Sequence, residues 1–146
     1  MELVPFSESG LNHVFANLWP RGVEELAILG TTLEGARQRY LEYAQHSFKC
    51  GVLERDGVPV AVLGISADSA GAFTWFQSTD EFHNNVRSIT RCIRDETRRY
   101  PGPLSIYSVC VHPETERWYG VCGFSKDNSF AKALPSGAVL KKFDRR

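Results

Sequence analysis

The sequence predicts one α/β domain in which a mixed, mostly antiparallel sheet carries helices on both of its faces. Three observations lead to this prediction: helical periodicity in the first third, β-rich segments with tight turns in the middle, and a long amphipathic helix between two strands thereafter. A length of 146 residues is that of a single domain, so we expect residues 1–146 to fold as one unit.

The first third of the chain predicts three helices and no strand. Ser7 or Ser9 can cap the first helix, whose apolar residues recur at helical spacing. Gly30 is typical of the residue that ends a helix, and it closes a short second one. Thr31 and Glu34 have the spacing of a capping box, with Thr31 as the N-cap, and this predicts the start of a third helix.

The middle of the chain predicts an antiparallel meander. Residues 48–54 and 58–66 are rich in β-forming side chains, and Arg55-Asp56-Gly57 joins them. Asp-Gly between two such segments is a strong hairpin signal. A third strand is expected over residues 73–77.

After the meander the apolar pattern changes to the helical period. Ser78 and Glu81 have capping-box spacing, and apolar residues then follow at i, i+4, i+7 and i+11 up to about Tyr100. A Pro-Gly-Pro sequence ends this helix, and residues 104–111 form an apolar strand. A short helix over 112–121 and closing strands complete the predicted order of elements. The long helix between two strands, placed after the meander, predicts a crossover connection within a mixed sheet.

Composition and charge exclude several classes of function. Seventeen basic residues balance seventeen acidic ones, so the overall charge does not favour nucleic acid. No segment is apolar enough for a membrane span, and no secretory signal is recognisable, so we expect a cytoplasmic protein. The four cysteines have neither C-x-x-C spacing nor a histidine at ligand spacing, and no metal site is expected.

The sequence V-H-P-E-T-E-R-W-Y-G-V-C-G-F, residues 111–124, points to a known family. Tyr119 and Gly123-Phe124 stand in the register of a motif that follows the fifth strand in many GNAT acyl-CoA N-acyltransferases. The chain therefore resembles the GNAT superfamily. The resemblance implies a sheet that splays open after its fourth strand, so that the strand ending at Gln77 and the one ending at Val111 diverge around a cleft.

The part of the chain from Cys50 onward resembles small GNAT-like proteins of short-tailed bacteriophages. The shared features are Gly57-x-Pro59, the Trp75-Phe76 strand, a basic amphipathic helix and an Arg-aromatic step before Gly-Phe. This resemblance covers about two thirds of the chain and implies a phage protein that acts in the cytoplasm of its host.

The GNAT resemblance implies acetyl-CoA or another acyl-CoA as the donor and an amine as the acceptor. Tyr119 is the implied catalytic residue, because a tyrosine at this position protonates the departing CoA thiolate. The residues that the register places beside the cofactor are Phe76, Gln77, Ser78, His83, Asn84, Asn85, Arg87 and His112. No general base is evident from the sequence, since Gln77, Ser78 and Ser108 could only orient a water molecule.

The sequence departs from the family pattern at the phosphate-binding loop, which leaves other functions open. No glycine occurs between Gly71 and Gly102, and Asp80 and Glu81 place two negative charges where a diphosphate would lie. One alternative is a catalytically inactive module that binds and modulates a host or virion protein. A weaker one is nucleic-acid binding through the arginines of the long helix, although acidic residues interrupt them.

Overall fold

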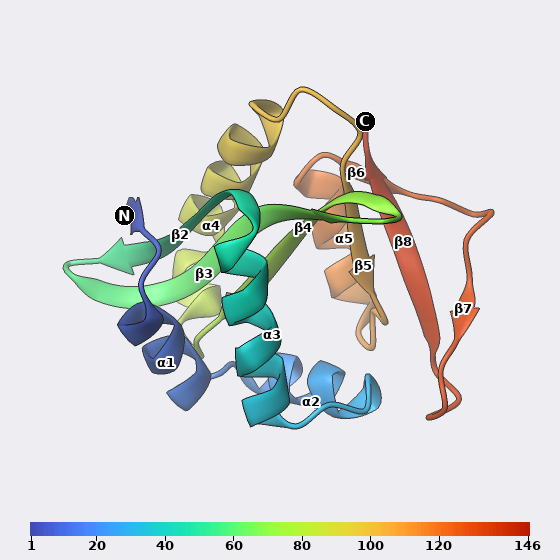
Figure 1. Cartoon of the computed structure of the whole chain (residues 1–146), viewed down its shortest axis with the longest axis horizontal. Coiled ribbons are helices and arrows are strands. Elements are labelled where there is room, and N and C mark those ends of the chain that lie inside the picture. The colour runs from blue at the N-terminus through green and yellow to red at the C-terminus, as the bar shows by residue number, and fades with distance from the viewer.

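Residues 1–146 of the computed structural model form one mixed sheet between two layers of helices (Figure 1). In chain order the elements are β1 Glu2–Pro5, α1 Glu8–Ala16, α2 Pro20–Ile28, α3 Leu33–Gln45, β2 Ser47–Arg55, β3 Val58–Asp68, β4 Gly71–Ser78, α4 Phe82–Arg98, β5 Ser105–Ser108, α5 Pro113–Val121, β6 Phe124–Lys126, β7 Lys132–Ala133 and β8 Val139–Arg145. The strand order is β1-β2-β3-β4-β5-β8-β6, with β7 paired to β8. All neighbours are antiparallel except β4 and β5, so the predicted mixed, mostly antiparallel sheet is confirmed.

Two separate apolar cores lie on the two faces of the sheet. On one face α1, α2 and α3 contribute Leu11, Val14 and Leu26 to a core that includes Trp75. On the other face α4 and α5 pack on the strands, and Ile89 of α4 is fully buried there. This three-layer arrangement follows from the helical periodicity, because each helix has one apolar face that must be covered.

The hairpin predicted at Asp56-Gly57 is confirmed and joins β2 to β3. Asp56 and Gly57 both have positive φ, 52° and 77°, as the two central residues of a type I′ turn require. A glycine is also required at position 64, because a Cβ there would lie 2.3 Å from the Trp75 ring on β4. Trp75 is thus held against β3, and its indole Nε1 donates to Ser66 Oγ at 2.9 Å.

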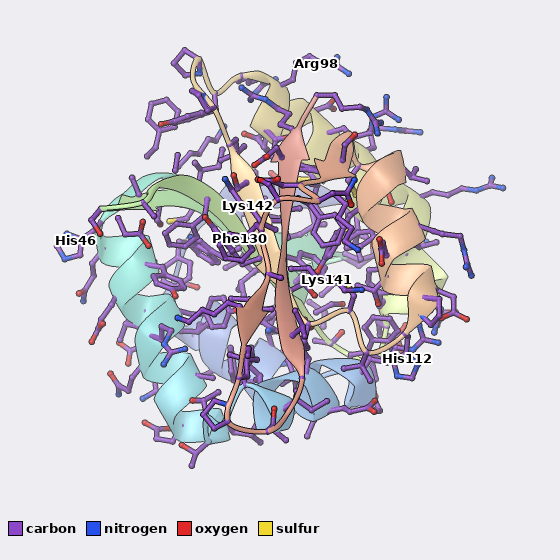
Figure 2. The ribbon with its side chains drawn as sticks, turned by 90° about the vertical axis from the view of Figure 1, so that its right-hand side faces the viewer. His46, Arg98, His112, Phe130, Lys141 and Lys142 are labelled. Atoms are coloured by element: carbon purple, nitrogen blue, oxygen red, sulfur yellow. The ribbon has the colours of Figure 1, made fainter.

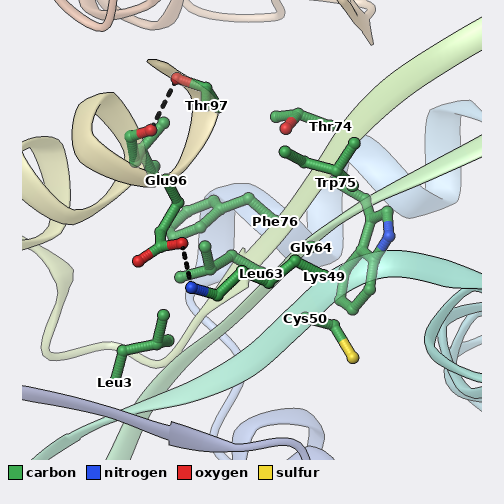
Figure 3. A pocket seen from close by; sticks show the side chains of 12 residues that line it. Leu3, Lys49, Cys50, Leu63, Gly64, Thr74, Trp75, Phe76, Glu96 and Thr97 are labelled. Atoms are coloured by element: carbon green, nitrogen blue, oxygen red, sulfur yellow. Dashed lines mark hydrogen bonds and ion pairs between the residues drawn. The ribbon is translucent and has the colours of Figure 1, made fainter. Parts of the chain in front are cut away.

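A small cavity of about 10 Å³ adjoins this part of the sheet, between β2, β3, β4 and α4 (Figure 3). Its rim carries an ion pair between Lys49 Nζ and Glu96 Oε2 at 2.7 Å. This volume has room for one water molecule at most, so the cavity is a packing defect and not a ligand site.

Four local expectations from the sequence are wrong. Residues 2–5 form β1, which pairs with β2; a four-residue strand is too short to show alternation. Thr32, not Thr31, caps α3 by accepting from the Gly35 N–H at 2.9 Å. The last strand before α5 ends at Ser108 and not at Val111, because Cys110 turns the chain with a φ of 46°.

The fourth wrong expectation is the capping box at the start of α4. Ser78 is still part of β4, and its hydroxyl donates to the Thr79 carbonyl at 2.9 Å instead of capping the helix. Glu81 occupies the N-cap position without a side-chain cap. As a consequence, only three residues, 79–81, connect β4 to α4.

Candidate functional site

Strands β4 and β5 separate almost as soon as they meet. Phe73 and Ser105 form the only Cα register pair between them, close to the start of each strand. Beyond this pair β4 runs on to Ser78 without a partner on the β5 side, while β5 remains paired to β8. The expected divergence of the two strands is therefore confirmed.

A cavity of about 830 Å³ occupies the gap that this divergence opens. Phe76 and Phe82 line it from the α4 side of the sheet, and Tyr40 and Trp75 line it from the α3 side. Since the same cavity is bounded by residues on both faces, it passes through the sheet between the two strands. A cavity of this size, with a mostly hydrophobic lining that includes many aromatic side chains, is typical of a site for a small organic ligand.

The inner wall of the cavity holds a carboxylate that is fixed by two donors. Glu25 of α2 accepts from Ser108 Oγ at 2.5 Å and from the Val109 N–H at 3.3 Å, both through Oε1. Burial raises the pKa of Glu25, and these two hydrogen bonds offset only part of that effect. A carboxylate with a raised pKa is a better proton acceptor, which is the property a general base needs.

Tyr119 lies on the same wall, next to this pair. Burial raises its pKa well above the usual value, the negative charge of Glu25 raises it further, and a hydrogen bond with Ser108 acts in the opposite direction. The ring packs against Phe143 and Trp118, with centroid distances of 5.0 Å and 5.7 Å. Tyr119 therefore stays protonated at neutral pH and lies near Ser108, whose hydroxyl donates to Glu25.

Two further polar side chains in the cavity, those of Gln77 and Cys110, are not placed or activated for catalysis. Gln77, predicted beside the cofactor, is buried and donates from Nε2 to Tyr40 Oη at 3.0 Å, which ties β4 to α3. Cys110 lies beside Ser108, with the two side-chain atoms 3.6 Å apart. Burial, and then the negative charges of nearby carboxylates, raise the pKa of the Cys110 thiol, so it is not an activated nucleophile.

At the outer end of the cavity, residues 79–81 form the turn between β4 and α4. The backbone N–H groups of this turn are already hydrogen-bonded within the chain. The Thr79 N–H donates to Val60 O at 2.9 Å, and the Asp80 N–H donates to Asn17 O at 3.1 Å. The Glu81 and Phe82 N–H groups donate to the side chain and the carbonyl of Thr79, at 3.3 Å and 3.2 Å. Every backbone donor of the three-residue turn therefore already has a partner within the chain.

Aromatic side chains cover the start of α4 at this outer end. Trp19 stacks on Phe82 with ring centroids 4.4 Å apart, and it contacts the His83 ring edge-on at 5.1 Å. The guanidinium of Arg21 lies over the indole, 5.3 Å from its centroid. All four side chains line the cavity, so the mouth is aromatic with one arginine and one histidine.

The residues predicted for the cofactor divide into two groups. Those that line the cavity are Phe76, Gln77, Ser78, His83 and His112. His112 Nε2 lies 2.9 Å from Glu24 Oε2, at the start of α5 (Figure 2). Those outside the lining are Asn84, Asn85 and Arg87; of these, Asn85 is buried and accepts from Arg55 Nη1 at 2.7 Å, while the other two are exposed.

Glu25 is the site residue that the sequence reasoning missed. Its role depends on contact with Ser108, which is 83 positions away along the chain. In the structure Glu25 lies three residues after the buried Gly22, which places the two residues on the same face of α2. A glutamate on the inward face of an amphipathic helix indicates a functional carboxylate.

Comparison with solved structures gives matches over the whole chain. Aminoglycoside acetyltransferase AAC(6')-Ib, in complex with paromomycin and acetyl-CoA, superposes with a TM-score of 0.69 at 14% identity, covering 99% of this chain and 92% of that one. A ribosomal-protein-alanine N-acetyltransferase from Brucella melitensis gives 0.68 at 11% identity, with 99% of both chains covered. A protein from Bordetella pertussis assigned to the GNAT family of acetyltransferases gives 0.68 at 14% identity, covering 99% and 94%.

The chain has the GNAT acetyltransferase fold. At these identities the superpositions establish the fold, and the sequence comparisons add nothing to it, since no family model and no curated protein matches the chain. The GNAT sheet expected from the Tyr119 to Phe124 motif is thereby confirmed. None of the five helices combines the length and the apolar character that crossing a bilayer requires.

Proposed function

We propose that this GNAT-fold protein is an N-acyltransferase, which moves an acetyl or other acyl group from a thioester of the acyl-CoA class to an amine. The observation that carries the proposal is that Glu25, hydrogen-bonded to Ser108, and Tyr119 both line a cavity that opens through the sheet. They supply one proton acceptor and one proton donor, which are the two groups that this transfer needs.

The unpaired strand edges suit the pantetheine arm of such a donor. Beyond Phe73 and Ser105, β4 and β5 are not paired with each other, so their facing edges present backbone N–H and C=O groups to the cavity, apart from Ser78 O, which accepts from the Trp19 N–H at 3.0 Å. Pantetheine is an extended chain with two amide groups. It can hydrogen-bond to such edges as an added strand would, with its thioester directed toward the inner wall.

In the proposed reaction Glu25 accepts a proton from the amine as the amine nitrogen attacks the thioester carbonyl carbon. A C–N bond forms, the C–S bond breaks, and Tyr119 donates its phenolic proton to the departing sulfur. Glu25 then returns its proton through Ser108 to Tyr119, so both residues regain their starting states. The raised pKa of Cys110 favours this direct transfer over an acyl-cysteine intermediate.

The test is to follow release of free thiol from acetyl-CoA and from S-acetyl-pantetheine with a panel of primary amines, and to measure binding of both thioesters by calorimetry. We expect amine-dependent thiol release with at least one thioester. Absence of both heat and thiol release at millimolar concentrations of either thioester would contradict the proposal.

The closed turn at the cavity mouth favours a second candidate function, an inactive GNAT-fold module that binds a host or virion protein. Origin in a short-tailed phage, implied by the resemblance of residues 50–146, is part of both candidate functions. A pull-down from bacterial lysate distinguishes the two functions. The alternative gains if a stoichiometric partner is captured while no thioester binds, and it fails if thioesters bind and react.

A further inference from the structure

The β4–α4 turn does not fit the diphosphate of CoA. A diphosphate needs free backbone N–H groups or cations at a helix start. Here the N–H groups of residues 79–82 are all bonded to Val60, Asn17 or Thr79, and only those of residues 83–85, in the first turn of α4, have no partner within the chain. The exposed carboxylates of Asp80 and Glu81 add negative charge at the same place. The inner wall is thus equipped for a thioester, whereas the turn at the outer end offers a diphosphate no free donor and two negative charges.

A row of unpaired arginines begins close to this outer end. Arg87, Arg91, Arg94 and Arg98 follow one another at i, i+4, i+7 and i+11, which places them on one face of α4. All four are exposed, and none makes an ion pair with a carboxylate, unlike the neighbouring Arg99, which pairs with Glu96. We refer to these four residues as the arginine row.

The arginine row leads away from the cavity mouth. It starts one turn after His83, which lines the mouth, and ends at Arg98 on the opposite end of α4, where Figure 2 shows the side chain projecting from the molecule. At 1.5 Å per residue the row is about 16 Å long. Because Ile89 and Ile93 bury the other face of the helix, the row is available to a partner.

From this juxtaposition we infer that the acyl donor reaches the cavity on the phosphopantetheine arm of an acidic carrier protein, which docks on the arginine row. This inference rests on the proposed function. A protein-bound phosphopantetheine has the same arm and the same thioester as CoA, but it has one phosphodiester in place of the diphosphate and no adenosine. It therefore needs no diphosphate site, and charge complementarity holds the carrier instead.

The charges around the row favour a protein over a nucleic acid. The row is only one side chain wide, with Asp95 exposed at its side and Asp80 and Glu81 at its end. A continuous polyanion would have to pass these carboxylates, whereas an acidic patch on a protein can be confined to the row. The net charge of zero also gives no general attraction to nucleic acid.

The experiment compares four probes with the full chain: acetyl-CoA, S-acetyl-pantetheine, an acetyl-loaded acidic acyl carrier protein, and that carrier without its arm. We expect acetyl-CoA to bind no more than about threefold more tightly than S-acetyl-pantetheine. We expect kcat/KM for the carrier-borne thioester to exceed that for acetyl-CoA by about tenfold or more, and the excess to fall with salt.

Two variants with the same change of charge separate docking from a general charge effect. Arg91→Glu lies in the middle of the row, and Lys126→Glu lies on β6, where Lys126 is exposed and makes no ion pair. Arg91→Glu should lower kcat/KM for the carrier-borne donor about tenfold and leave S-acetyl-pantetheine unaffected. Lys126→Glu should leave both unchanged.

The outcomes that overturn the inference are distinct from failure of the proposed function. Acetyl-CoA binding more than tenfold tighter than S-acetyl-pantetheine would show that the diphosphate is recognised, and the inference would fall while the acyltransferase remained. Equal effects of the two charge variants, or tighter binding of an RNA or DNA oligonucleotide than of the carrier, would remove the docking surface. If none of the thioesters binds or releases thiol, the proposed function itself is contradicted.

Discussion

The two ends of the cavity differ in how far their polar groups are already used. At the inner end Glu25, hydrogen-bonded to Ser108, and the neighbouring Tyr119 line the cavity and still have capacity to exchange protons. At the outer end the turn of residues 79–81 has no backbone donor left, and Trp19 and Phe82 pack against each other over the start of α4. One end keeps groups for chemistry, whereas the turn at the other end keeps no backbone N–H group for a nucleotide.

This difference teaches that the parts of a shared fold can change independently. The opening between β4 and β5 requires only that the strands diverge after Phe73, a property of the backbone. Binding of a diphosphate requires free N–H groups or cations at the turn, and here the three-residue turn has no free N–H group. A reaction at the inner end can therefore persist while recognition of the donor moves elsewhere.

The largest expected effect is at the inner end. Glu25→Gln keeps the size and an oxygen acceptor for Ser108 but cannot take up the proton of the amine. We expect kcat/KM to fall about 100-fold or more. Glu24→Gln is the matched control, because Glu24 is the adjacent glutamate but is exposed and pairs with His112; its kcat/KM should change less than threefold. A similar loss in both variants would contradict the assignment of the base.

Glu25→Gln should also raise the free energy of unfolding at neutral pH. Burial raises the pKa of Glu25 in the folded state, so the ionised carboxylate opposes folding once the pH passes its ordinary pKa. The stability that the protonated form contributes is complete at low pH and is lost as the pH rises through the raised pKa. The gain in the variant should therefore disappear below about pH 4, and urea unfolding at pH 3.5 and pH 7.5 measures it.

A smaller effect is expected at Tyr119. Tyr119→Phe removes the proton donor but keeps the ring that packs on Phe143. We expect kcat to fall about tenfold with an alkyl thioester and hardly at all with an aryl thioester, whose thiolate leaves without protonation. Tyr100→Phe, at a ring that packs against Phe48, serves as the control. An equal loss with both kinds of thioester would assign Tyr119 a packing role only.

The smallest effect is expected at the outer end and tests whether the two ends are independent. Asp80→Asn combined with Glu81→Gln removes two charges near the expected position of a diphosphate, each worth about 0.3–1 kcal/mol at a helix start. Affinity for acetyl-CoA should rise about threefold, and that for S-acetyl-pantetheine should stay the same. Calorimetry with both ligands measures this, and a change for S-acetyl-pantetheine would show that the ends are coupled.

The elements that the sequence predicted well are those with a long or specific local signal. Phe82, Ile89 and Ile93 recur at helical spacing over about three turns, and α4 followed as expected. Asp56-Gly57 defined its turn by backbone conformation alone. Short elements lacked such a signal: β1 is held by pairing with β2, where Gly51 lets the chains approach, since a Cβ there would lie 2.8 Å from Val4 O.

The site was predictable only where it coincided with a family motif. Tyr119 was located by its register before Gly123 and Phe124, and it does line the cavity, although its catalytic role stays a prediction. Glu25 could not be located in this way, because an Arg-Gly-Val-Glu-Glu-Leu sequence is ordinary for a surface helix. Only the packing of α2 against the end of β5 brings its carboxylate to Ser108.

The single register pair between Phe73 and Ser105 also has a mechanical consequence. It joins two half-sheets, β1 to β4 and β5 with β8 and β6, at one point near the start of β5. No other strand pairing joins the two half-sheets, so we expect the cleft between β4 and β5 to widen when it admits a bulky acceptor. Amide hydrogen exchange along the edge of β4 that faces the cavity should consequently be fast in the free protein and slow once an occupant bridges the two halves.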